Sequence, residues 1–137
     1  YGADGYKEYI GALGIQDPAV MSNVLGGSIA AAEAGRYLEA LHRYMETGLF
    51  GAQLKDHLMN TRNLMIRSGW PVARKYGWDE KAFHDMAVVY AEHPYYLAVL
   101  TDKWGGSWAE YGMFTTIAQT LEEIMTAKYA ALEPAPG

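Results

Sequence analysis

The stretch from residue 83 to residue 117 constrains the fold more than any other part of the chain. Its sequence, FHDMAVVYAEHPYYLAVLTDKWGGSWAEYGMFTTI, holds six Tyr or Trp residues in 35 positions. Pro94 disfavours a helical conformation at His93, and Gly105-Gly106 allows a tight turn. We therefore predict the end of one helix, a corner at His93-Pro94, a short helix, a glycine turn and the start of a last helix.

Apolar residues at helical spacing indicate further helices upstream. The clearest case is residues 29–47, where Ala34, Leu38 and Leu41 lie on one stripe and Gly48 supplies a C-terminal stop. No period-two alternation is recognised anywhere in the chain. The other helices predicted are residues 6–13, 52–67, 80–92, 95–104 and a last helix capped by Ser107, with a short helical turn through Lys75 after Trp70-Pro71. The sequence therefore predicts an all-α fold.

Length, charge and cysteine content exclude several classes of protein. With 137 residues, the chain is expected to form one helical domain, residues 1–137. The formal net charge of −5 argues against a nucleic-acid partner, which needs clustered basic residues. The chain has no cysteine, which excludes disulfides, thiolate metal sites and a cysteine nucleophile. Because no apolar run is long enough to span a bilayer, we expect no membrane partner and a cytoplasmic location.

The four histidines are candidate ligands of a metal or a haem. Glu39 and His42 match the Glu-x-x-His motif of di-iron helical bundles, but no second copy with the same spacing occurs. His57 or His84 could serve as an axial haem ligand in a helical protein of this size. The simpler interpretation is that these residues lie on solvated helix faces, and we expect no metal and no cofactor.

Two short motifs are candidates for a general base and for an anion-binding site. Asp56-His57 resembles a base with its orienting partner, yet neighbours on a helix point about 100° apart and do not face each other. Gly105-Gly106-Ser107 before a helix could bind an anion through its amides. A turn followed by an N-cap explains the second motif more simply.

The aromatic and methionine content is the stronger signal of function. The chain has eleven Tyr, four Trp, three Phe and seven Met. Aromatic side chains combine a large contact area with polar tips, and Met adapts to irregular shapes. The composition is typical of a cleft for a bulky, flat organic molecule, although an ordinary aromatic core would use the same residues.

Part of the chain resembles a known family. The matching residues in the stretch 86–117 are Met86, Tyr90-Ala91-Glu92, Pro94, Asp102-Lys103, Gly105 or Gly106, Ala109-Glu110-Tyr111 and Ile117, with an upstream match over residues 41–48, LHRYMETG. These residues resemble the TipAS-like antibiotic-binding domain, which follows MerR-type DNA-binding domains or occurs as a free-standing drug-binding protein. The resemblance implies a globin-like arrangement of about five to seven helices around a cleft for thiopeptides or similar antibiotics. Members that capture their ligand covalently use a cysteine, so reversible binding is implied here.

We therefore expect a binding module, with sensing or sequestration of a bulky hydrophobic or aromatic molecule such as a peptide antibiotic. The role would lie in antibiotic resistance or transcription regulation, and an enzyme is disfavoured. A metal- or haem-dependent helical enzyme and a helical oligomer subunit, including a homodimer, remain alternatives. The expected ligand-binding residues are Met86, Tyr90, Tyr96, Trp104, Trp108 and Tyr111. Phe83 and Tyr90 are expected to be the most buried of the aromatic residues around the cleft.

Overall fold

The computed structural model describes residues 3–15, 29–62, 65–79, 82–102 and 112–132. Within these ranges the chain forms helices and strands in a mixed order. The elements are α1 (Ala3–Ala12), α3 (Ala31–Thr47), α4 (Gly51–Met59), β1 (Val72–Asp79), β2 (Ala82–Val89), β3 (Tyr95–Thr101) and α5 (Gly112–Ala130).

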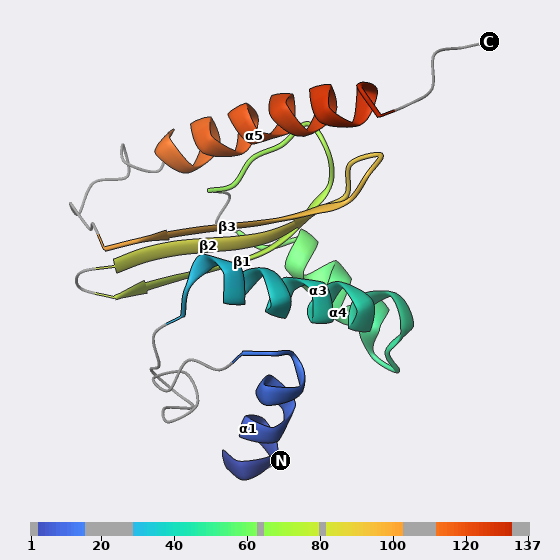
Figure 1. Ribbon diagram of the computed structural model, residues 1–137, viewed down its shortest axis with the longest axis vertical. Helices are drawn as coiled ribbons and strands as arrows, with labels where there is room; N and C mark the ends of the chain where they lie inside the picture. The colour runs from blue at the N-terminus through green and yellow to red at the C-terminus, as the bar shows by residue number, and fades with distance from the viewer. Residues whose placement is uncertain (1–2, 16–28, 63–64, 80–81, 103–111, 133–137) are drawn as a thin grey trace.

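The elements form layers around a sheet (Figure 1). Helix α5 lies along one face of the sheet, and α3 and α4 lie along the other. Helix α1 lies beyond α3 and is joined to it by a hydrogen bond of 2.9 Å between the hydroxyls of Tyr6 and Tyr37. None of the helices in the described ranges has the length and apolar character that crossing a membrane requires.

The sheet has the order β1-β2-β3, and both pairs are antiparallel. Lys75 on β1 pairs with Met86 on β2, and Met86 pairs with Ala98 on β3. Residues that pair directly lie on the same face, and neighbours along a strand point to opposite faces. The register therefore assigns every side chain of the sheet either to the α5 layer or to the α3–α4 layer.

Each face of the sheet buries its own apolar cluster. On the α5 face, Phe83 packs edge-to-face against Phe114 of α5, with ring centroids 5.5 Å apart and planes at 77°. On the other face, Ala73 and Val88 pack against Leu38 of α3. Central strand β2 is covered on both sides, which explains why burial alternates along its first residues and why Ala87, Val88 and Val89 are all buried.

The predicted all-α, globin-like fold is wrong, because the helices predicted over residues 80–92 and 95–104, and the helical turn through Lys75, are strands β2, β3 and β1. Apolar runs of seven or eight residues fit a buried strand as well as a helix, and periodicity alone does not separate the two. The Val, Tyr and Phe content of these runs favours strands. Phe83 is buried as expected, but Tyr90 is only partly buried.

The predicted helices agree more closely with the structure where capping residues and apolar periodicity indicate the same segment. The predicted helix over residues 29–47 is α3, which ends before Gly48 as expected. The helix predicted over residues 52–67 is the shorter α4, which ends at Met59. The chain beyond α4 is held by tertiary hydrogen bonds instead of helical ones.

A buried carboxylate holds that chain segment against the sheet. Asp85 on β2 is fully buried and its Oδ2 accepts a 3.0 Å hydrogen bond from the amide of Ile66. Arg74 on β1 donates from its guanidinium to the carbonyl of Ile66. Burial raises the pKa of Asp85 to about 6, although the Ile66 amide and the charge of Arg74 oppose the rise. Asp85 therefore binds the backbone of Ile66, but burial of its carboxylate disfavours the charged form.

The raised pKa of Asp85 predicts a pH dependence of stability. Its folded pKa of about 6 lies above the ordinary value of 3.8, so its contribution to the unfolding free energy is present below pH 4 and is lost as the pH rises through 6. Asp85→Asn keeps an acceptor for Ile66 and removes the titration. Urea denaturation at pH 4 and pH 7 should show the variant gaining about 2 kcal/mol relative to the unmodified protein over this interval. A difference that does not change with pH would contradict the prediction.

Two glycines allow contrasting substitutions. Gly51 lies against the end of α3, whereas Gly35 lies inside α3 with free space around it. A Cβ on buried Gly51 would lie 2.3 Å from the carbonyl oxygen of Tyr44, so Gly51→Ala should destabilise the protein by about 1–3 kcal/mol. Gly35, inside α3, has nothing within 4 Å of such a Cβ, and Gly35→Ala should stabilise the protein by about 1 kcal/mol through helix propensity. Thermal unfolding of the two variants should therefore shift in opposite directions.

Candidate functional site

Strand β1 is an edge of the described sheet and carries the sequence Lys75-Tyr76-Gly77. Lys75 pairs with Met86, which belongs to the α3–α4 face, so the Lys75 side chain lies on that face. Tyr76 lies on the opposite face, where its ring stacks on Phe83 at 6.5 Å between centroids. The side chains of Lys75 and Tyr76 therefore leave the strand towards opposite faces of the sheet.

The main chain of β1 alternates in the same way. The amide of Tyr90 donates a 2.9 Å hydrogen bond to the carbonyl of Pro71, which fixes residues 71 and 90 as a hydrogen-bonded pair. In an antiparallel ladder every second residue then directs its N–H and C=O towards β2, and the residues between direct theirs outwards. Lys75 bonds towards β2, whereas the main-chain groups of Tyr76 point to the outer edge.

The ammonium group of Lys75 lies at this outer edge. Its Nζ donates a 2.6 Å hydrogen bond to the carbonyl of Tyr76 and lies 4.8 Å from the centroid of the Tyr76 ring. The side chain is exposed, and no carboxylate of the described residues lies within ion-pair distance of it. Lys75 is therefore a positive charge without an acidic partner in the part of the protein that the structure describes.

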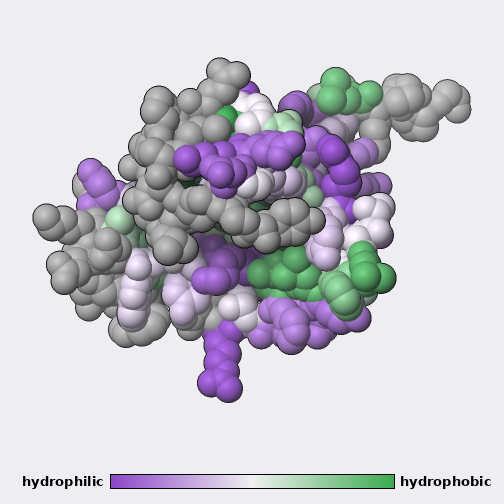
Figure 2. All heavy atoms as spheres, turned by 90° about the horizontal axis from the view of Figure 1, so that it is seen from below, coloured by the Kyte–Doolittle hydropathy of each residue, from purple (hydrophilic) through white to green (hydrophobic). Residues whose placement is uncertain are grey.

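Lys75 also borders an open apolar groove of 570 Å³. The groove lies between α1, α3, α4 and the sheet, and Figure 2, seen from the α1 side, shows hydrophobic residues gathered over α3 and α4. Its lining residues are Tyr9, Ile29, Tyr37, Leu38, Ala40, Leu41, Tyr44, Leu54, Leu58, Lys75 and Met86. Lys75 is the one charged residue among them, so the groove combines an apolar wall with a single cation.

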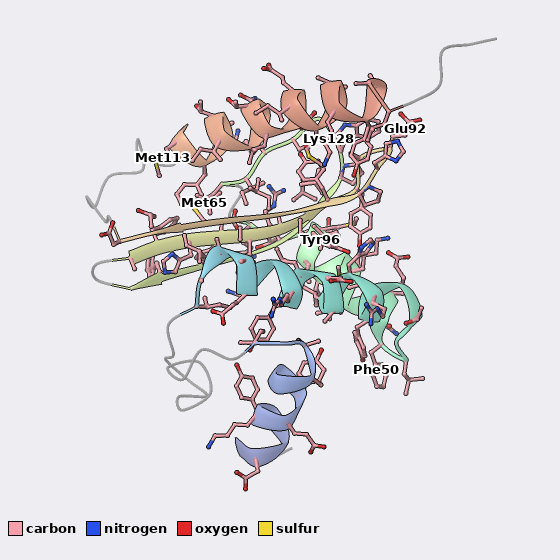
Figure 3. All side chains as sticks on the ribbon, in the orientation of Figure 1. Phe50, Met65, Glu92, Tyr96, Met113 and Lys128 are labelled. Carbon is pink, nitrogen blue, oxygen red and sulfur yellow. The ribbon has the colours of Figure 1, made fainter. Side chains whose placement is uncertain are left out.

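Of the six predicted ligand-binding residues, the structure describes three, and these three do not all line one groove. Met86 lines the groove beside Lys75. Tyr90 and Tyr96 lie instead on either side of His42, with their ring centroids 5.2 Å and 5.8 Å from the His42 ring (Figure 3 labels Tyr96). The other three, Trp104, Trp108 and Tyr111, lie outside the described residues. Phe83, expected to be buried beside the same cleft, lies on the opposite face of the sheet from Met86 and Tyr90.

His42 belongs to a polar network at the end of the sheet. Its Nδ1 lies 3.2 Å from the Tyr96 hydroxyl, and its Nε2 lies 3.8 Å from Glu46. Lys55 donates a 2.7 Å hydrogen bond to Glu46, lowers the pKa of that carboxyl, and lies 4.0 Å over the ring of Tyr90. Each charge in this network has a partner, which is typical of a surface network.

The histidines do not form a metal site in the described ranges. Glu39 of the Glu-x-x-His motif bonds to Arg43 at 3.3 Å. His57 is exposed on α4, and His84 Nδ1 lies 3.1 Å from the amide of Thr101 on the neighbouring strand. No group of three potential metal ligands occurs among the described residues. The helical metal- or haem-enzyme alternative also loses its basis, because it depended on an all-helical fold.

Comparisons with known proteins correct the resemblance inferred from the sequence. A family model described as the beta-lactamase enzyme family matches residues 2–125. No curated protein matches the chain. The resemblance to a TipAS-like domain is therefore wrong, and so is the interpretation as a non-enzymatic antibiotic sensor with a role in transcription regulation. The resemblance implied helices over residues 86–101, whereas these residues form strands and a turn.

Serine β-lactamases carry three motifs, Ser-x-x-Lys, Ser-Asp-Asn and Lys-Thr-Gly. Lys75-Tyr76-Gly77 preserves the lysine and the glycine of the third motif, with Tyr in place of Thr, and the first two do not occur in the 137 residues. Lys75 is not among the residues expected from the sequence to bind a ligand, because its segment was predicted to be a helical turn and is strand β1. A three-residue motif with one departure is recognisable only when the strand around it is known.

The match over residues 2–125 covers most of the 137 residues of the chain. The chain belongs to the beta-lactamase enzyme family.

Proposed function

We propose that this chain takes part in the hydrolysis of a small amide of the β-lactam type that carries a carboxylate, and that β1 binds this substrate. The observation that supports the proposal most directly is the ammonium group of Lys75, which has no acidic partner in the described ranges and borders an apolar groove. Family membership supports the hydrolytic reaction. Hydrogen bonds between an ammonium group and a carboxylate are among the stronger ones in proteins.

The edge of β1 supplies the second kind of contact. An extended ligand can add to an exposed sheet edge through main-chain hydrogen bonds. The outward amide and carbonyl of Tyr76 are placed for such contacts with the amide group of a substrate. The Tyr76 side chain packs on Phe83, away from the groove, so only its main chain would serve the substrate. This explains how Tyr can stand where the family motif has Thr.

The groove would hold the apolar part of the substrate. Met86, expected from the sequence to contact a ligand, forms part of its wall next to Lys75, and we assign it contact with the substrate's acyl group. Ligand contacts at Tyr90 and Tyr96 stay predictions, as do the cytoplasmic location and the homodimer.

Lys75→Met should weaken binding of a carboxylate-bearing β-lactam. Loss of a charge-assisted hydrogen bond typically costs about 1.5–3 kcal/mol, so Kd measured by isothermal titration should rise at least about tenfold. Lys128→Met is the matched control, because Lys128 is exposed on α5, on the other side of the sheet from the groove. Equal affinity of the Lys75 variant and the unmodified protein would refute the role of Lys75.

A carboxyl-esterified analogue of the same β-lactam tests the pairing itself. If Lys75 binds the carboxylate, the ester should bind the unmodified protein as weakly as the free acid binds Lys75→Met. The ester should then lose nothing further in the variant, because the two changes remove the same contact. Independent, additive losses would place the carboxylate elsewhere. Absence of any β-lactam binding or hydrolysis by the unmodified protein would overturn the proposed function as a whole.

A further inference from the structure

A second pocket lies on the α5 face of the sheet and shares no residue with the groove beside Lys75. It has a volume of 140 Å³ and is formed by α5, the turn between β2 and β3, and the segment before β1. Figure 3 labels Glu92 in this turn, close to the end of α5. The volume is close to that of an engineered cavity of about 150 Å³ that holds one benzene molecule. The pocket therefore suits a ligand with one small ring or a short chain.

A fixed carboxylate lines this pocket. Oε2 of Glu122 accepts hydrogen bonds from the hydroxyl of Ser68 and, at 3.3 Å, from the amide of Gly69. Ser68 is itself held, because its Oγ accepts a 3.0 Å hydrogen bond from the amide of Trp70. Oε1 of Glu122 has no hydrogen-bond partner, and Glu122 no cationic partner, among the described residues. One oxygen of the carboxylate is thus positioned and the other is available.

Tyr95, which has a buried hydroxyl, lines the same pocket. Tyr95 is only 8% exposed, and its hydroxyl forms no hydrogen bond with the described residues. Tyr95 and Glu122 both line the pocket, and burial, followed by the negative charge of Glu122, raises the pKa of Tyr95. Buried polar groups without partners are rare in folded proteins, because each forfeits its hydrogen bonds to water. A ligand with N–H donors would satisfy both groups.

The remaining walls are aromatic. The rings of His93 and Tyr129 stack at 4.1 Å between centroids, with an interplanar angle of 25°. Trp70 forms another wall. Faces of aromatic rings attract cations, and Trp does so most strongly. No lysine or arginine lines the pocket, whereas Glu92 and Glu122 both do. Aromatic faces and carboxylates together favour a positively charged organic ligand.

We propose that this pocket binds a small organic ammonium ion, which donates hydrogen bonds to Glu122 and Tyr95 and lies against Trp70 and the stacked His93–Tyr129 pair. The inference does not depend on the proposed hydrolytic function, because the two sites lie on opposite faces of the sheet. An uncharged ligand of the same shape would leave the carboxylate of Glu122 without a counter-charge.

Isothermal titration of the full chain with benzylammonium and with benzyl alcohol, its neutral analogue, tests the proposal. Benzylammonium should bind at least about tenfold more tightly than benzyl alcohol. Equal affinities would show that the pocket is merely apolar and would overturn the proposal, as would the absence of benzylammonium binding.

Two variants assign the binding to this pocket. Glu122→Gln keeps an acceptor for Ser68 and Gly69 but removes the charge, and it should weaken benzylammonium binding about tenfold while leaving benzyl alcohol unaffected. Glu123→Gln is the matched control, because the exposed neighbour does not line the pocket and its loss should change neither affinity. Equal effects of the two variants would indicate attraction by surface charge alone and would overturn the site.

Tyr95→Phe provides a readout that does not depend on the carboxylate. The variant should bind benzylammonium several-fold more weakly. Its thermal midpoint without ligand should not fall, since the hydroxyl that is removed has no partner in the described part of the protein. Unchanged affinity would remove Tyr95 from the site, and a lower midpoint would show that the hydroxyl is already satisfied.

Discussion

The antiparallel register of the three strands is the constraint on which both sites depend. Because side chains alternate between two faces, adjacent residues of one strand serve different layers of the molecule. Lys75 borders the groove on the α3–α4 side, and Tyr76 packs under α5. Tyr95 lines the small pocket on the α5 side, whereas Tyr96 contacts His42 of α3. A shift of the register by one residue would exchange these assignments and destroy both sites at once.

The sequence was informative where a local signal was sufficient. Helix α3 was predicted because its apolar stripe repeats over several turns and Gly48 ends it. The strands were misassigned because each is short and β2 is buried on both faces, so its apolar residues do not simply alternate with polar ones. Two errors followed from missing the strands. Lys75 was assigned to a helical turn, and residues of β2 and β3 were matched to a helical family.

The small pocket could not have been predicted from the sequence. Its carboxylate comes from α5, its buried hydroxyl from the start of β3, and one aromatic wall from Trp70 before β1. These positions are up to about fifty residues apart in the chain, and no local pattern connects them. Each residue has an ordinary individual explanation, such as an exposed tryptophan or a glutamate on a helix. Only the tertiary structure brings Tyr95 and Glu122 to the lining of one pocket.

The segment over residues 65–70 explains how α5 is attached to the sheet. The carbonyl of Met65 accepts a 3.0 Å hydrogen bond from Thr115 of α5, and Ile66 is held from the sheet by Asp85 and Arg74. Ser68 and Gly69 then bond to Glu122, again on α5. Hydrogen bonds thus run alternately from this segment to the helix and to the sheet. The same bonds that fix α5 also orient the carboxylate of Glu122, so the small pocket is built on a structural element and not on an isolated surface side chain.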